Sequence, residues 1–287
     1  RKHFGLARSP FHDDVRTRAD VFASGNTRYV RAALLDAALN HGFMAIVGES
    51  GAGKSTLVEE LEERIVDEGR QVIVIRPYVV AMEADDVKGR SLKSSAIAEA
   101  IIRTLDPAAT PKSSHDALYR QLHELLKASR AAGYSHMLII EEAHCLPKAT
   151  LKHLKRFLEL KQGLGRLLGI CLVGQPELLT LLSDRSPEVR EVVQRCEIVE
   201  LMPLDNDLGD YLRHKFDRMG AKYDDVFTDD ACDAIRAKLI RVPRGGTSAD
   251  AHSLCFPLVV NNLVARAMNA AALSGWEKVD AQVIGGC

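Results

Sequence analysis

Residues 48–55 of the chain read Gly48-Glu49-Ser50-Gly51-Ala52-Gly53-Lys54-Ser55. This stretch has the spacing G-x-x-x-x-G-K-[ST], which is typical of a phosphate-binding loop. An apolar run at 43–47 precedes it, and apolar residues at helical spacing follow it from Leu57 onward. A strand, a glycine-rich loop and a helix are the context that this motif requires. The sequence therefore predicts a nucleotide-binding site at this loop.

The residue types of the loop suit the chemistry of a bound nucleotide. Gly51 and Gly53 allow backbone N–H groups to wrap around phosphate oxygens, because glycine has no Cβ that would clash. Lys54 is expected to reach the β- and γ-phosphates, and the Ser55 hydroxyl is expected to bind Mg²⁺. The helix that follows turns its positive end toward the anion. We therefore expect ATP and Mg²⁺ as cofactors, with the nucleotide bound by Gly48, Glu49, Ser50, Gly51, Ala52, Gly53, Lys54, Ser55 and Thr56.

Two carboxylates follow another apolar run, because Glu141 and Glu142 come directly after residues 137–140. In P-loop ATPases such a strand lies beside the P-loop strand. Its first acidic residue orients Mg²⁺ or its water, and the second can polarise the attacking water. We therefore predict Glu141 as a metal ligand and Glu142 as the residue that activates water. The usual first residue is Asp, and Glu141 is one methylene longer. The alternative interpretation is the start of a helix, where acidic residues are also favoured.

A polar residue also follows the apolar run at 167–173, where the chain reads Gly174-Gln175-Pro176-Glu177-Leu178. A polar side chain next to the γ-phosphate could sense hydrolysis, so we assign Gln175 to this catalytic role. The alternative is a helix-start turn with Pro176 at the first helical position.

Composition limits the classes of function. The 287 residues carry a formal net charge of −1, so DNA binding requires a local patch of basic residues. The six cysteines show no C-x-x-C pair and no zinc spacing, which favours free thiols in a reducing compartment. No apolar run approaches the ~20 residues of a membrane span, and no signal peptide is visible. We therefore expect a cytoplasmic protein without a membrane partner.

Two basic segments compete as the DNA-binding patch. The polar connection at 76–94 carries Lys88, Arg90 and Lys93, and no aromatic residue lies between them. This pattern favours contact with backbone phosphates over stacking on bases. The predicted helix at 148–161 is the alternative DNA-binding segment, because Lys148, Lys152 and Arg156 are spaced four residues apart and lie on one face of the helix. Either segment is alternatively an ordinary solvated surface.

Hydrophobic periodicity predicts strands that alternate with helices. Apolar runs predict strands at 43–47, 72–75, 137–140, 167–173 and 196–201. Cap residues and helical spacing predict helices at 27–40, 95–105, 114–132, 148–161, 187–194, 205–218, 228–240 and 257–273, before a short end that is expected to fray. We expect an N-terminal arm at 1–24, a nucleotide-binding core at 25–203 and a helical lid at 204–287. The aromatic residues of the arm either pack on the core or cover the nucleotide base.

The order of these motifs resembles that of AAA+ ATPases. A finer resemblance is to the ExeA-like group, which includes secretion-assembly ATPases and the transposition regulators of Mu-like phages and Tn7-like elements. It rests on Phe4-Gly5-Leu6, Pro10-Phe11, residues 174–178, Gln194-Arg195 and Leu201-Met202-Pro203-Leu204. Residues 256–263 look most like the transposition B proteins of Mu-like phages. The ExeA-type pattern has Arg as the second sensor of the lid at the position where this chain has Leu258.

The resemblance implies an α/β fold with a parallel five-stranded sheet flanked by helices and a C-terminal helical lid. It also implies an ATPase in the cytoplasm of a bacterial host cell. This ATPase would assemble on duplex DNA as a homo-oligomeric filament or ring, hand the DNA to a transposase, and disassemble on ATP hydrolysis. Arg195 matches the Q-R position of the group and is expected to act as an arginine finger, with Arg190 as the alternative. Two other functions stay open: assembly of a secretion or other machine, and a nucleotide-gated signalling switch.

Overall fold

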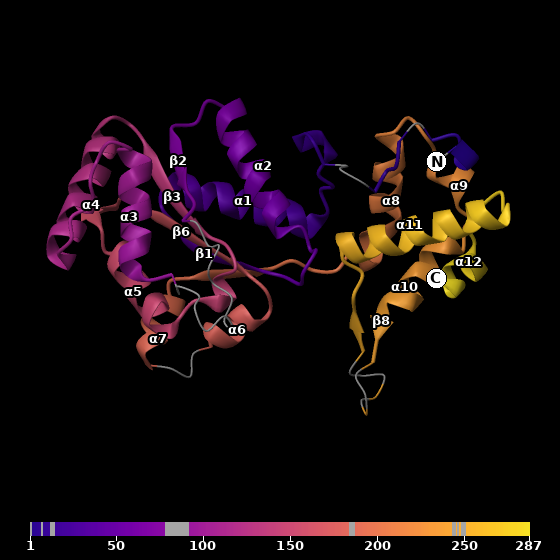
Figure 1. The fold of residues 1–287 in the computed structure, drawn as a ribbon. Coiled ribbons are helices and arrows are strands. Elements are labelled where there is room, and N and C mark those ends of the chain that lie inside the picture. Colours follow the sequence, from indigo (N-terminus) through magenta and orange to yellow (C-terminus); the bar gives the residue numbers. More distant parts are fainter. Residues whose placement is uncertain are drawn as a thin grey trace. The chain divides into compact units, whose positions relative to one another are not determined.

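The computed structural model describes residues 2–6, 8–11, 15–77, 92–183, 187–242, 245, 247 and 251–287. The chain divides into two compact units. The sheet unit comprises Tyr29–Gly48 and Leu57–Leu201. The helical unit comprises Arg1–Arg28, Glu49–Thr56 and Met202–Cys287, and therefore includes the P-loop residues. Figure 1 labels the helices and strands of both units.

The sheet has five parallel strands in the order β2-β3-β6-β1-β7. Their bounds are β1 Phe43–Val47, β2 Val72–Ile75, β3 Ser135–Ile140, β6 Gly169–Gly174 and β7 Glu197–Glu200. Every residue of β1, β3 and β6 is buried, as expected for parallel strands that are covered on both faces. The predicted α/β fold with a parallel five-stranded sheet is therefore confirmed.

Helices cover both faces of this sheet. They are α1 Gly25–Asn40, α2 Lys54–Asp67, α3 Ser94–Leu105, α4 His115–Ala131, α5 Lys148–Leu158, α6 Glu177–Leu181 and α7 Pro187–Val193. Apolar residues of α3, α4, α5 and α7 form one core with the strands, and Figure 1 shows α1 and α2 on the opposite side of the sheet. Helix α4 begins where the sequence predicts, because the Ser114 side chain accepts the N–H of Ala117.

Helix α5 ends three residues earlier than predicted. A short hairpin follows it, formed by β4 Lys161–Gln162 and β5 Gly165–Arg166. Gly163 at the turn has φ +60°, a backbone conformation that favours glycine over other residues. Gly163 and Gly165 therefore turn the chain back at a point where the predicted helix would have continued.

The helical unit has its own core. Its elements are α8 Leu208–Asp217, α9 Tyr223–Val226, α10 Ala231–Leu239, α11 Pro257–Ser274, α12 Ala281–Gly286 and the short strands β8 Ile240–Arg241 and β9 His252–Ser253. Helix α12 corrects the expected frayed end: the Asp280 side chain caps it by accepting the N–H of Val283, and Ile284 is buried. Four 3₁₀ turns complete the described elements: Lys2–Phe4, Arg18–Asp20, Ala143–Cys145 (η3) and Asp205–Asp207. Among the described helices, none is long and apolar enough to cross a membrane.

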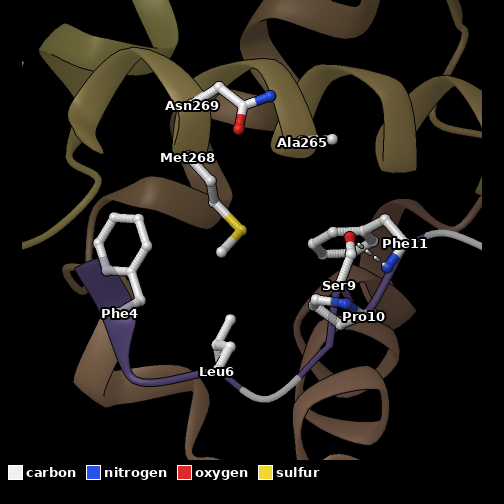
Figure 2. Close-up of a pocket in the computed structure, with 8 residues that line it drawn as sticks. All are labelled: Phe4, Leu6, Ser9, Pro10, Phe11, Ala265, Met268 and Asn269. Atoms are coloured by element: carbon white, nitrogen blue, oxygen red, sulfur yellow. Dashed lines mark hydrogen bonds between the residues drawn. The ribbon is translucent and has the colours of Figure 1, made fainter. Parts of the chain in front are cut away.

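The N-terminal arm packs on the core of the helical unit. Leu6 and Phe11 are buried there, and Phe11 lies edge-to-face against Phe216 with ring centroids 6.0 Å apart. Figure 2 shows Met268 of α11 pointing between Phe4 and Phe11, at the side of a cavity of about 170 Å³. The arm thus packs on the helical unit through its aromatic residues. The expectation that it covers a nucleotide base stays a prediction.

Candidate nucleotide site

Three parallel strands deliver the predicted site residues to one edge of the sheet. Strands β1, β3 and β6 are neighbours, and their carboxyl ends are followed by the P-loop, by Glu141 and Glu142, and by Gln175, respectively. The N–H of Gly48 donates to the carbonyl of Gly174 over 3.2 Å, which joins the first P-loop residue to the end of β6. Ligands of open α/β sheets bind outside the carboxyl ends of the strands. This edge is therefore the candidate site.

The P-loop itself has the backbone that its glycines predict. Gly51 and Gly53 have φ angles of +77° and +94°, which residues with a Cβ rarely adopt. The N–H of Ala52 donates to the carbonyl of Glu49 over 3.1 Å, and the Lys54 ammonium donates to the same carbonyl over 2.8 Å. Ser55 and Thr56 follow Lys54 in the first turn of α2. The loop is thus closed on itself, with the lysine folded back over its own backbone.

Within the helical unit, Leu258 packs against the P-loop. Its N–H donates to the carbonyl of Gly51 over 3.2 Å. A Cβ placed on Gly51 would lie only 2.4 Å from the Cβ of Leu258, so the close approach requires glycine there. The position at which the ExeA-type pattern has a charged sensor therefore makes an apolar contact with the loop, and Leu258 itself provides no charge for a phosphate.

Glu141 follows β3 and is paired with a cation in the structure. The guanidinium of Arg76, which follows β2, forms an ion pair with Glu141 and also contacts Glu62 of α2 at 3.3 Å. Burial opposes the charged form of Arg76, but its hydrogen bond to Glu141 and the charge of that carboxylate raise the pKa of Arg76 overall. Arg76 therefore holds the predicted metal ligand at the site edge, a contact that the sequence pattern did not reveal.

Glu142 has an unusual backbone and an open side chain. Its φ of +48° places it in the left-handed region, which is uncommon for a residue other than glycine. Its side chain is 56% exposed, and its Oε2 atom lies 3.6 Å from Nε2 of His144. Such outliers occur more often at active sites. Solvent therefore reaches the carboxylate that the sequence predicts to activate water.

His144 links Glu142 to Gln175 and was missed by sequence reasoning. Its Nδ1 atom accepts the backbone N–H of Gln175 over 3.3 Å. A backbone N–H can only donate, so the ring proton of a neutral His144 is assigned to Nε2, the nitrogen that faces Glu142. The only signal in the sequence was a histidine two residues after Glu142, which alone does not distinguish a functional role from packing.

Gly174 allows β6 to approach the His144 segment. A Cβ at Gly174 would lie 2.9 Å from the Leu178 side chain and 3.2 Å from the backbone nitrogen of His144. Gln175 is half-buried just beyond, and α6 starts after Pro176. A helix therefore does start here, with Pro176 directly before its first residue and not at it, while the role of Gln175 as a sensor of hydrolysis stays a prediction.

The predicted arginine fingers lie outside this edge. Arg190 is exposed on α7, and Arg195 is exposed in the connection between α7 and β7. Neither is placed by the structure against a nucleotide of another subunit, so the finger stays a prediction.

The DNA-binding prediction at 76–94 is only partly covered. Lys88 and Arg90 lie outside the described residues, and Lys93 is exposed directly before α3. The competing cations on α5, Lys148, Lys152 and Arg156, are all exposed. The structure therefore describes the alternative DNA-binding patch on α5, while most of the preferred patch at 76–94 stays a prediction.

Oxygen donors at the site suit Mg²⁺. Among the described residues, no group of three or more His, Cys, Asp or Glu could hold a metal ion by itself. Magnesium usually binds through one or two protein oxygens together with nucleotide phosphates and water. The hydroxyl of Ser55 in the helical unit and the carboxylate of Glu141 in the sheet unit are each donors of this class, so the donor types present are those that such an ion takes.

Comparison with known proteins gives a family match to this region. The model of the AAA domain family matches residues 38–182, which contain the P-loop, Glu141, Glu142 and Gln175. General secretion pathway protein A of Aeromonas hydrophila is 25% identical over 240 residues. That alignment covers 83% of this chain but 38% of that protein, so the chain spans less than half the length of its relative. The ExeA-like resemblance is supported, and the narrower likeness to transposition B proteins stays a prediction.

Solved structures share the fold at low identity. Cdc6p from Pyrobaculum aerophilum has a TM-score of 0.59 at 16% identity, with 94% of this chain and 67% of that chain covered. The Aeropyrum pernix ORC1 protein in complex with DNA has a TM-score of 0.56 at 17% identity, with 97% and 68% covered. At these identities the likeness concerns the fold alone.

Proposed function

The chain belongs to the AAA domain family, and we propose that it is an ATPase whose nucleotide cycle controls assembly of the protein on duplex DNA. The observation that carries the catalytic part is the contact chain from Glu142 through His144 to the backbone of Gln175. This chain connects the predicted water-activating carboxylate to the predicted sensor of the γ-phosphate. It gives the site a means of coupling hydrolysis to the end of β6.

In the proposed cycle, the P-loop backbone and Lys54 bind the phosphates, and Ser55 and Glu141 hold Mg²⁺. The ion neutralises the negative charge that develops on the phosphate oxygens when it is bound. Glu142 orients the attacking water and accepts its proton, while His144 fixes the direction of the Glu142 carboxylate. Arg195 of a neighbouring subunit supplies positive charge to the γ-phosphate. Assembly and hydrolysis are therefore linked, because one subunit completes the site of the next.

Duplex DNA is the proposed partner in this cycle, and a transposase is the proposed recipient of the DNA. The ExeA-like sequence motifs and residues 256–263 support the transposition role. The Aeropyrum pernix ORC1 protein of similar fold was solved in complex with DNA, which is compatible with DNA binding by this fold. A formal net charge of −1 means that single subunits bind DNA weakly, and an assembly sums many weak contacts.

Sedimentation with plasmid DNA tests the proposal. We expect the wild-type chain to pellet with DNA when ATP is present and to stay in the supernatant without ATP. Lys54→Ala is the control, because loss of the ammonium removes the main point charge on the phosphates and should abolish both ATP binding and pelleting. Pelleting that is independent of ATP, or absent in all nucleotide states, would contradict DNA assembly under nucleotide control.

A second candidate function is assembly of a secretion machine. The alignment with General secretion pathway protein A favours it, although that alignment covers 38% of the relative. This function predicts ATP hydrolysis without an effect of plasmid DNA on sedimentation or turnover. The same sedimentation experiment therefore separates the two candidates.

A further inference from the structure

The β4–β5 hairpin presents a large apolar side chain to solvent. Leu164 lies at its tip between Gly163 and Gly165 and is fully exposed, with a relative accessibility of 101%. Most leucines of the sheet unit are buried in its core, so this one contributes nothing to the packing that holds the chain together. An exposed leucine at a glycine-flanked tip is therefore available for contact with a partner.

Two cations face each other directly below this tip. The strand register pairs Lys161 with Arg166, and like charges opposite one another destabilise an antiparallel pair. Neither side chain has an ion-pair partner among the residues that the structure describes. The two strands thus place two positively charged residues opposite each other, an arrangement that suits binding of an anion.

The base of the hairpin is fixed to the sheet unit. An imidazole nitrogen of His123 on α4 bonds to the carbonyl of Lys161 over 2.8 Å. The N–H of Leu167 donates to the carbonyl of Leu160 over 3.0 Å, and Leu167 is buried. The backbone at the base of the hairpin is therefore anchored to the sheet unit before any partner binds, which reduces the backbone entropy lost on binding.

Exposed basic residues also occur on α4, which contacts the hairpin through His123, and on α5, which precedes the hairpin in the chain. Arg120 is exposed one turn before His123, and Lys152 and Arg156 are exposed on α5. Burial, and then the positive charges of Arg156, His115 and Lys152, lower the pKa of His153 on α5. Two acidic neighbours, Glu124 and Glu159, are engaged by Lys127 and Lys155. Asp116 near the start of α4 is a further carboxylate there.

We propose that the β4–β5 hairpin and the adjoining basic surface of α4 and α5 form a contact with duplex DNA. Lys161 and Arg166 bind backbone phosphates, and Leu164 makes apolar contact with base edges in the major groove, which is wide enough for a two-stranded ribbon. No aromatic ring is exposed on the hairpin, so stacking on single-stranded bases is not the mode of binding. The inference rests on the proposed DNA function and names a contact separate from residues 76–94.

Equilibrium binding to a fluorescein-labelled duplex, with a non-hydrolysable ATP analogue, tests this contact. Lys161→Gln/Arg166→Gln should weaken binding at least tenfold. It should also make the slope of log K against log salt shallower by about 1.8, since each lost phosphate contact removes about 0.9. Leu164→Ser should weaken binding without changing that slope, because no charge is lost. Arg28→Gln/Lys222→Gln, a matched loss of two exposed cations, should bind like the wild type.

Three outcomes would overturn the contact. The first is wild-type affinity of both hairpin variants for DNA. That result would exclude the hairpin as the DNA contact without contradicting the proposed DNA function. The second is loss of self-association without DNA in the Lys161→Gln/Arg166→Gln variant, measured by sedimentation velocity, which assigns the surface to a second copy of the chain. The third is a wild-type chain that binds no duplex in any nucleotide state, which removes the proposed DNA function together with this contact.

Discussion

At the scale of single residues, the site depends on side chains that only the fold brings together. His144 lies between Glu142 and Gln175, although Gln175 is far along the chain. Arg76 reaches Glu141 from the end of a different strand. The sequence identifies the P-loop and both glutamates because their spacing is local. It does not identify Arg76 or His144, because their roles come from the order of strands in the sheet.

Substitution of His144 tests whether it positions Glu142. We expect His144→Leu to lower kcat by about tenfold or more while the affinity for ATP is unchanged, because the Glu142 carboxylate loses its fixed partner. His144→Gln should restore most of the rate, since its amide can accept the Gln175 N–H and donate to Glu142. Steady-state phosphate release and binding of a fluorescent nucleotide measure the two quantities.

The double variant His144→Leu/Glu142→Gln provides the control for this prediction. If His144 acts through Glu142, the double variant should hydrolyse ATP no more slowly than Glu142→Gln alone. Rate losses that multiply, or a His144→Gln variant as slow as His144→Leu, would contradict a positioning role.

A buried histidine makes stability depend on pH. Burial, with smaller effects from Arg130 and His136, lowers the pKa of His41 to about 4. The unfolded chain therefore takes up a proton first, near pH 6.5, and the free energy of unfolding falls as the pH drops from there toward 4, by up to about 1.4 kcal/mol per pH unit. His41→Asn should flatten this dependence, because asparagine tolerates the φ of +55° and does not titrate. Urea unfolding at several pH values measures it, and equal slopes for both proteins would contradict the assignment.

At the scale of elements, local chemistry predicts where most helices and strands lie. The Ser114 cap, the apolar strands and the P-loop glycines place their elements close to the predicted bounds. The hairpin after α5 was not predicted, because Leu160 and Leu164 continue the apolar spacing of the helix while two glycines turn the chain. Helix α12 was not predicted either, because its stability comes from packing of Ile284 on the core of the helical unit. One miss therefore comes from glycine turn chemistry within an apolar pattern that continues the helix, and the other from tertiary packing of a short C-terminal helix.

One ion pair joins two helices of the sheet unit. Arg31 of α1 contacts both carboxylate oxygens of Glu60 on α2, and the Glu60 side chain is 3% exposed. Arg31→Met should destabilise the fold by about 3 kcal/mol, because it removes both guanidinium hydrogen bonds from a buried carboxylate. Arg31→Met/Glu60→Met should recover most of that loss. Urea unfolding measures both variants, and a double variant as unstable as the single one would show that the cost arises from packing instead.

At the scale of the whole molecule, the proposed nucleotide cycle requires one subunit to act on the next. Arg195 is exposed after α7 and is the predicted finger. Arg195→Ala should abolish DNA-dependent assembly and should also lower the ATP turnover rate by about 10³-fold. Single subunits of this variant should still bind ATP. Arg28→Ala, which removes another exposed cation, should change neither. If Arg195→Ala assembles and hydrolyses normally, Arg190 becomes the candidate, and the corresponding substitution tests it directly.

The rate of phosphate release by Glu142→Gln, with Mg²⁺, ATP and duplex DNA present, tests the central claim most directly. We expect the variant to bind ATP and DNA like the wild type but to release phosphate at least about 100-fold more slowly, because the amide cannot accept a proton from water. Because hydrolysis drives disassembly, the variant should also remain on DNA when ATP is removed. Wild-type phosphate release by Glu142→Gln would contradict the claim and move the catalytic role to Glu141.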